Sequence, residues 1–234
     1  MNFEFLLAGP KLLCWQKCFN LSVYYGFFGP HNCHRVCQWR LKKTKNHKNK
    51  QMPIYTKKGD RGETSIFRKK EGQSIRVSKA DLLIEAIGSI DESNSYLGII
   101  AAKANKVPST KILKGKIEKI QRDLFTIGSI LAGAKLGLTG ARVEELEQEI
   151  DEMDDKLPKL NNFILPGGSE VSAHLMFMRV IVRRAERRVV ALAKKMTINH
   201  QLLKYLNRLS DYLFVLARWV NFQSKVKETK WVQN

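Results

Sequence analysis

Apolar residues recur at every third or fourth position over most of the chain from Ser78 onward. Spacing of this kind places apolar side chains on one face of an α-helix. Five such runs follow one another, and they begin at Leu83, Leu113, Val143, Val171 and Leu202. Segments that break helices separate them, at Pro108, Gly133–Gly140, Pro158–Gly168 and Thr197–Asn199. A sustained alternation of three and four is typical of helices packed at shallow angles, so the pattern predicts an all-α five-helix bundle.

Two of the helix starts carry capping signals. Ser78 is followed by Asp81 three residues later, which resembles a capping box at the start of the first helix. Ser169 follows Pro166-Gly167-Gly168 and is expected to cap the fourth helix.

The first 51 residues show neither helical nor strand periodicity, and we treat them as a leader separate from a helical domain over residues 52–234. The chain has 234 residues and a formal net charge of +19, of which the leader contributes +8. We expect the leader to be disordered or to reflect a misassigned start, with Met52 as the true first residue. Its longest stretch without charged side chains, Cys18–His34, is interrupted by Asn and Gly, so we expect no membrane span.

The leader also bears on compartment and metal binding. It has two Arg and one Ser, whereas transit peptides are rich in both, so we expect a cytoplasmic protein, with the mitochondrial matrix as the alternative if the leader is a transit peptide. All four cysteines lie there as two C-x3-C pairs around His31 and His34, a spacing that zinc sites tolerate, although no surrounding fold is evident. The rest of the chain has no cysteine, which excludes a disulfide scaffold or a thiol nucleophile in the helical domain.

A glycine-containing loop, Tyr55–Ser65, precedes the first helix. Gly59 and Gly62 let the backbone approach a ligand closely, and lysines, an arginine and hydroxyl groups surround them. Such a loop can present N–H groups, hydroxyls and cations to phosphate oxygens. The P-loop pattern G-x-x-x-x-G-K-[ST] does not occur in the chain, and a solvated glycine-rich turn remains the alternative.

The fourth helix carries an arginine-rich stripe beside its apolar positions. Arg179, Arg183 and Glu186 fall at i, i+4 and i+7. Arginine next to a buried face is costly unless an anion or a carboxylate meets it, so the stripe favours an anionic ligand. For Arg184 and Arg188 a solvated cationic face is the better interpretation.

Polar residues also flank the apolar positions of the fifth and first helices. Asn207, Asp211 and Arg218 share one face of the fifth helix, where they form either part of a site or an interhelical hydrogen-bond network. Asp91 lies beside Ile90 on the first helix and needs a cationic partner if it is buried.

Five ordered segments resemble the PduO-type ATP:cob(I)alamin adenosyltransferases, and together they cover residues 53 to about 218: Tyr55–Gly62, Glu85–Glu92, Phe163–Gly168, Arg183–Arg188 and Leu206–Phe214. The resemblance implies a five-helix bundle that forms homotrimers, with ATP held at the subunit interfaces. The leader lies outside it.

The resemblance also implies roles for individual residues. Arg179 and Asp91 correspond to an ion pair that shapes the site across the interface, and with Arg183 they are the expected catalytic residues. Phe163 corresponds to the aromatic residue that faces the corrin and helps to hold cobalamin without its lower axial ligand. Lys58 stands where the family often has a small hydroxyl residue, which leaves its contact open. The expected ATP-binding residues are Thr56, Lys57, Gly59, Thr64, Ser65, Lys79, Arg183, Glu186, Arg187 and Asn207.

The implied reaction transfers the 5′-deoxyadenosyl group of ATP to the cobalt of cob(I)alamin and expels triphosphate. The corrinoid supplies the nucleophile, so the protein has to supply positioning and positive charge, with Mg²⁺ as the expected metal. The expected partners are a cob(II)alamin reductase and an adenosylcobalamin-dependent acceptor enzyme. The alternatives are a non-catalytic corrinoid-binding chaperone of the same fold and a basic nucleic-acid-binding protein, for which no motif is visible.

Overall fold

The computed structural model describes residues 55, 57–70, 73–105 and 112–232. The leader with its four cysteines and the expected ATP ligand Thr56 lie outside these residues, so the predictions made for them stay untested. The chain divides into two compact units, Met1–Thr56 and Lys57–Asn234, and the second unit holds the described helices and strands.

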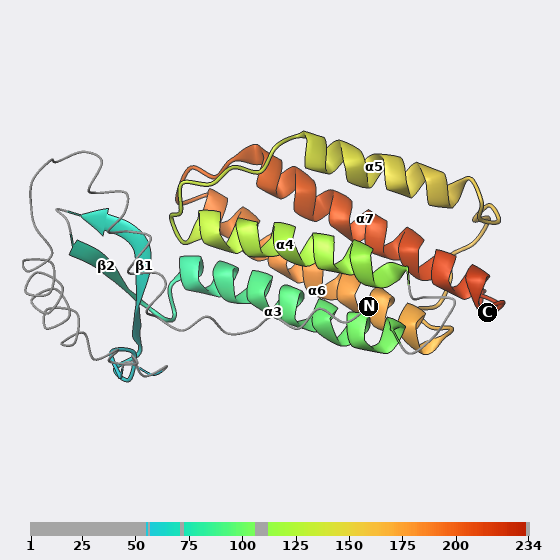
Figure 1. Ribbon diagram of the computed structural model, residues 1–234, viewed down its shortest axis with the longest axis horizontal. Coiled ribbons are helices and arrows are strands. Elements are labelled where there is room, and N and C mark those ends of the chain that lie inside the picture. The colour runs from blue at the N-terminus through green and yellow to red at the C-terminus, as the bar shows by residue number, and fades with distance from the viewer. Residues whose placement is uncertain (1–54, 56, 71–72, 106–111, 233–234) are drawn as a thin grey trace, which may run out of the picture. The chain divides into compact units, whose positions relative to one another are not determined.

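Five helices make up most of the described chain, as the apolar pattern predicts. They are α3 (Leu82–Ala104), α4 (Leu113–Leu131), α5 (Ala141–Asp154), α6 (Glu170–Ala193) and α7 (His200–Gln223). Helix α6 packs against both α3 and α7, while α4 packs against α3 and α5 packs against α7 (Figure 1). None of the described helices is long and apolar enough to cross a membrane.

The core consists of the residues that recur at three- and four-residue spacing. In α6, for example, Leu175, Met178, Val182, Ala185 and Val189 are fully buried. These positions face the other helices because they repeat close to the 3.6-residue period of the helix. The apolar stripes of the five helices meet in one continuous cluster.

The helix starts confirm one capping prediction and correct the other. The Ser169 hydroxyl accepts a hydrogen bond from the Ser172 backbone N–H at 3.4 Å and caps α6. The first helix is capped by Asp81, whose carboxylate accepts from the Leu83 N–H at 2.7 Å, so the predicted Ser78 cap is wrong. Ser78 ends a strand instead, and the chain needs the following two residues to turn into the helix.

A small antiparallel hairpin precedes the bundle and was not predicted. Strand β1 (Glu63–Lys70) pairs with β2 (Gln73–Ser78), with an irregularity in the register between Ser65 and Lys69. Thr64 and Ser65 therefore lie on a strand rather than in the glycine loop. The hairpin places Ser65 directly opposite Arg76.

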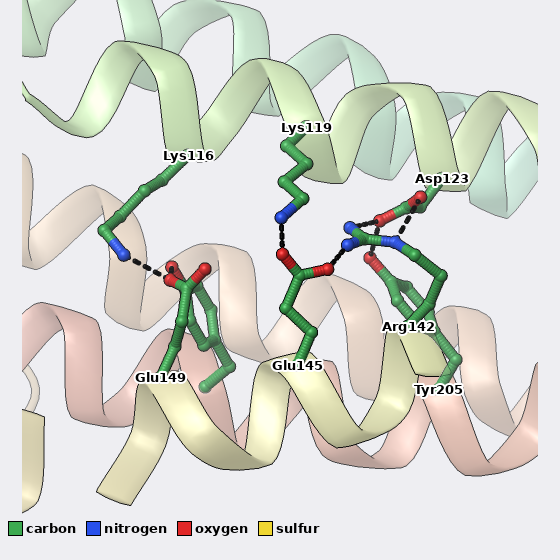
Figure 2. Close-up of polar contacts among 8 residues, drawn as sticks. Lys116, Lys119, Asp123, Arg142, Glu145, Glu149 and Tyr205 are labelled. Carbon is green, nitrogen blue, oxygen red and sulfur yellow. Dashed lines mark hydrogen bonds and ion pairs between the residues drawn. The ribbon is translucent and has the colours of Figure 1, made fainter. Parts of the chain in front are cut away.

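A polar seam joins α4, α5 and α7. Figure 2 shows Lys116, Lys119 and Asp123 of α4 pointing toward Arg142, Glu145 and Glu149 of α5, with which they form ion pairs. Tyr205 of α7 is fully buried and donates a hydrogen bond to Asp123 at 2.8 Å, and Tyr212 donates to Glu149 at the same distance. Charged side chains that would be costly to bury alone are thus paired and hydrogen-bonded.

The segment after α7 turns back and fixes the connection between α5 and α6. The Leu165 N–H donates to the Thr229 carbonyl at 2.8 Å, and the Trp231 N–H donates to the Phe163 carbonyl at 2.7 Å. Arg218 is 2% exposed and donates to the Pro158 carbonyl at 2.7 Å and to Glu228 at 3.2 Å. These bonds hold the Phe163 segment in place although its side chain is exposed.

Candidate active site

The glycine loop is closed by backbone bonds and by one lysine. The Gly62 N–H donates to the Gly59 carbonyl at 3.2 Å, and the Lys79 N–H donates to the Gly62 carbonyl at 2.8 Å. The Lys79 ammonium also donates to the Gly59 carbonyl at 2.9 Å. Gly62 has φ +79, a conformation that disfavours any residue with a side chain, and Lys57 shares this left-handed region at φ +59. Gly59 and Lys79, two of the residues expected to bind ATP, are therefore in contact, and Lys57 lies two residues before Gly59 in the same loop.

Arg76 of β2 contacts the same loop, and the sequence pattern did not indicate it. Its guanidinium donates to the Lys58 carbonyl at 2.7 Å, pairs with Glu63 at 3.3 Å and donates to the Ser65 hydroxyl at 3.5 Å. It helps to line a cationic hollow of about 780 Å³, together with Lys57, Lys58, Asp60, Arg61, Glu63 and Ser65. The hairpin register that places Arg76 opposite Ser65 is the signal that would have identified it.

The arginines of α6 divide into two sets. Arg184 pairs with Glu92 and Arg188 pairs with Glu85, and both carboxylates belong to α3. These two arginines thus join helices, rather than forming the solvated face that was expected. Arg183 and Arg187 are exposed and form no ion pair with any described residue.

The second set lies beside α7. The Glu186 carboxylate accepts a hydrogen bond from the Asn207 side-chain amide at 3.1 Å, and Arg187 donates to the Arg183 carbonyl at 3.2 Å. Glu186 and Asn207 are thus brought together from two helices, next to Arg183 and Arg187. The surface combines cations with an amide and one carboxylate, groups that can bind the phosphates and hydroxyls of a nucleotide.

Arg179 lies on the wall of a separate cavity of about 820 Å³ that Phe163, Asp211 and Phe214 also line. Its guanidinium stands 5.5 Å from the centre of the Phe214 ring, and its Nε is buried without a hydrogen-bond partner among the described residues. Phe163 lines this cavity and is 81% exposed. A large, partly aromatic cavity with an arginine whose Nε has no hydrogen-bond partner among the described residues suits a bulky ligand with polar groups at its edge.

Asp91 does not pair with Arg179 within the described part of this single chain. It is exposed on α3, and it lines a smaller cavity of about 330 Å³ between α3 and α4. The predicted ion pair is one between subunits, so one chain leaves it untested.

The three polar residues of α7 do not form one network. Asp211 pairs with Arg208 at 3.0 Å, Asn207 bonds to Glu186, and Arg218 is buried about three helical turns after Asn207.

Neither a hydrogen bond nor an ion pair of the described residues joins the glycine loop to the stripe on α6. The described ATP-binding candidates thus form two groups within one chain, whereas Arg179 and Phe163 line a separate cavity and Asp91 of α3 lines a third. Across the described ranges, no three His, Cys, Asp or Glu side chains cluster in a way that could hold a metal ion.

Comparisons with known proteins agree with these features. The family model for cobalamin adenosyltransferase matches residues 54–220. The corrinoid adenosyltransferase of Bacillus subtilis (strain 168) is 41% identical over 184 residues, which are 77% of this chain and 92% of that protein. The corrinoid adenosyltransferase MMAB of Homo sapiens is 37% identical over 191 residues, covering 77% of this chain and 74% of that protein.

Solved structures show the same fold. A variant of the PduO-type adenosyltransferase from Lactobacillus reuteri complexed with ATP superposes with a TM-score of 0.71 at 34% identity, covering 76% of this chain and all of that one (100%). A second variant of that enzyme, complexed with cobalamin and ATP, gives the same TM-score of 0.71 at 33% identity, covering 76% of this chain and 96% of that one. The chain therefore belongs to the cobalamin adenosyltransferase family, as a PduO-type corrinoid adenosyltransferase.

Proposed function

We propose that this chain transfers the 5′-deoxyadenosyl group of ATP to the cobalt of cob(I)alamin, forming adenosylcobalamin and releasing triphosphate. The observation that carries this proposal is the pair of cationic surfaces, the glycine loop and the α6 stripe, in a chain of this family. In the reaction a Co–C bond forms as the bond from C5′ to the triphosphate oxygen breaks, so the leaving group takes the electron pair. The corrinoid is the nucleophile, and no side-chain nucleophile or general base is required.

The described residues supply binding and charge. Lys57, Gly59, Thr64, Ser65 and Lys79 would bind the triphosphate of ATP, and Thr56 has the same proposed role. Arg183 and Arg187 would stabilise the negative charge that develops on the leaving triphosphate, because preformed cations act most strongly where charge increases in the transition state. Glu186 and Asn207, already bonded to each other, would orient the nucleoside part.

The site is proposed to be completed by a second copy of the chain in a homotrimer. Two observations support this arrangement. The loop group and the α6 group share no hydrogen bond or ion pair within the described residues of one chain. Among the same residues the Arg179 Nε has no hydrogen-bond partner and Asp91 has no ion-pair partner, as expected if the two pair with each other across an interface. Phe163, which lines the Arg179 cavity, would face the corrin.

Mg²⁺ is proposed to enter with ATP. It commonly keeps several waters and binds through substrate phosphates with one or two carboxylates, so it does not require a dedicated protein cluster. A cob(II)alamin reductase and an adenosylcobalamin-dependent enzyme are the proposed partners. We propose a cytoplasmic location, with the mitochondrial matrix as the alternative if the leader is a transit peptide.

The role of Arg183 can be tested by substitution. We expect Arg183→Ala to lower ATP-dependent adenosylation of cob(I)alamin by at least about 100-fold, since a lost charge-assisted contact to a developing anion is worth about 3 kcal/mol. The measurement is the spectral change from cob(I)alamin to adenosylcobalamin. Arg184→Ala is the matched control, because it removes the neighbouring arginine that pairs with Glu92. Turnover of Arg183→Ala equal to that of Arg184→Ala would contradict the assignment.

A further inference from the structure

A second cavity lies next to the one proposed to receive the corrin. It has a volume of about 510 Å³ and is enclosed by the connection between α5 and α6 and by the segment that follows α7. It shares Leu160, Asn161, Asn162 and Ile164 with the cavity that Phe163 and Arg179 line, so one stretch of chain forms a wall of both. The family model ends at residue 220, before most of this cavity's second wall.

The cavity is preformed. Arg218 lines it and bonds to both walls, to the Pro158 carbonyl on one side and to Glu228 on the other. Backbone hydrogen bonds join the same two walls, from Leu165 to Thr229 and from Trp231 to Phe163. A ligand would therefore meet walls that are already in place, which lowers the cost of binding.

The lining is apolar with a strong excess of positive charge. Leu157, Ile164, Phe222 and Val226 provide apolar surface. Four lysines stand around them, namely Lys159, Lys225, Lys227 and Lys230. Glu228 is the one carboxylate among the described lining residues, and it already forms an ion pair with Arg218. None of the four lysines forms an ion pair within the described ranges, so this cavity suits a ligand with a flat apolar part and a phosphate.

We propose that this cavity binds the nucleotide tail of cobalamin, the benzimidazole ribose phosphate that is released from cobalt when the corrin is held without its lower axial ligand. The proposal rests on the proposed function, since it requires a corrin in the neighbouring cavity beside Phe163. The tail is covalently attached to the corrin ring. Its phosphodiester would contact the lysines, and its aromatic base would contact the apolar lining residues of the cavity. A nearby site for it would also keep the base away from the cobalt.

The test compares two corrinoids and two pairs of variants. Cob(II)inamide has the corrin ring without the nucleotide tail, so the difference between cob(II)alamin and cob(II)inamide reports the tail alone. We expect the Lys159→Gln/Lys227→Gln variant to raise the Kd of cob(II)alamin about tenfold. The Kd of cob(II)inamide should not change. The control, Lys135→Gln/Lys195→Gln, removes the same charge from exposed positions outside both cavities and should affect neither ligand.

Other outcomes would overturn the proposal. An equal increase in the Kd of both corrinoids would show that the lysines contact the corrin ring. An unchanged Kd for both would show that the cavity has no role in corrinoid binding. If inorganic phosphate binds to the wild type, loses affinity in the lysine variant, and cob(II)alamin shows no advantage over cob(II)inamide, then the cavity takes free phosphate instead. Adenosylation of cob(I)inamide by the wild type tests the proposed function separately, because that substrate has no tail.

Discussion

At the scale of single residues, the turn before α6 shows how one buried amide fixes the segment that carries Phe163. Asn221 is buried on α7, accepts a hydrogen bond from the Ser169 N–H at 2.9 Å and donates to the Gly167 carbonyl at 3.2 Å. Gly168 lies against it at φ +105. A Cβ at residue 168 would stand 2.6 Å from the Asn221 Cγ, closer than side chains can approach.

We therefore expect Gly168→Ala to lower the free energy of unfolding by about 2–4 kcal/mol, through left-handed strain and the clash with Asn221. Denaturant unfolding followed by circular dichroism measures this change. Gly167→Ala is the matched control, since no atom lies within 4 Å of its added Cβ and its φ is not positive. A loss of stability that is equal in the two variants would refute the explanation.

In this turn, the sequence could predict the role of one residue but not that of another. The capping role of Ser169 could be predicted because it directly follows Pro166-Gly167-Gly168, which is a local signal. The role of Asn221 depends on packing between segments more than fifty residues apart in sequence, which no local pattern reveals. Arg76 was missed for a related reason, since its partners become visible only once the hairpin register is known.

At the scale of elements, α5 is joined to α4 by ion pairs and to α7 by packing. The helical pattern predicted α5 correctly, because its apolar positions recur at the helical period. The charges of α5 gave no sign of their partners, since most of these partners lie on other helices, α4 and α7. Hairpin β1–β2 was missed because the loop was judged by its glycines and cations, and Thr64 and Ser65 were interpreted as part of that loop.

The two buried tyrosines of the seam, Tyr205 and Tyr212, should make the free energy of unfolding depend on pH in the alkaline range. Burial, reinforced by the carboxylates of Asp123 and Glu149, raises the pKa of the Tyr205 and Tyr212 phenols above the ordinary value. The unfolded chain releases these protons near pH 10 while the native state retains them, so their stabilising effect is complete below about pH 10 and is lost as the pH rises above it. We expect the free energy of unfolding to fall between about pH 10 and 12, by up to about 1.4 kcal/mol per pH unit for each tyrosine.

The double variant Tyr205→Phe/Tyr212→Phe should lose this dependence. At pH 7 it should be less stable than the wild type by about 1.5–3 kcal/mol for each hydrogen bond lost to a charged group. Urea unfolding at several pH values measures both effects. An alkaline slope that is unchanged in the double variant would show that other groups cause it.

At the scale of the whole molecule, the five-helix bundle and the family followed from sequence because ordered motifs and helical periodicity extend over most of the chain. The roles of the site residues stay predictions from the resemblance. The structure shows that Lys79 contacts Gly59 in the loop and that Asn207 contacts Glu186 beside Arg183 and Arg187. We propose that the two groups meet only between subunits, where each site takes its loop from one copy and its arginines from the next.

Inter-subunit complementation tests whether the loop and the arginines of one site belong to different copies of the chain. Lys57→Ala disables the loop group and Arg183→Ala disables the α6 group, so each variant alone should form almost no adenosylcobalamin from cob(I)alamin and ATP. The two variants would be co-expressed with different affinity tags, and assemblies that carry both tags would be purified and assayed beside the wild type.

If each site takes its loop from one copy and its arginines from the next, every trimer that carries both tags has about one third of its sites intact, with a matching gain in adenosylcobalamin. If both groups of a site belong to the same chain, every site in the mixed assembly carries one of the two substitutions. We therefore predict recovery of activity in the mixed assemblies. Mixed assemblies as inactive as the separate variants, beside an active wild type, would contradict a site shared between subunits.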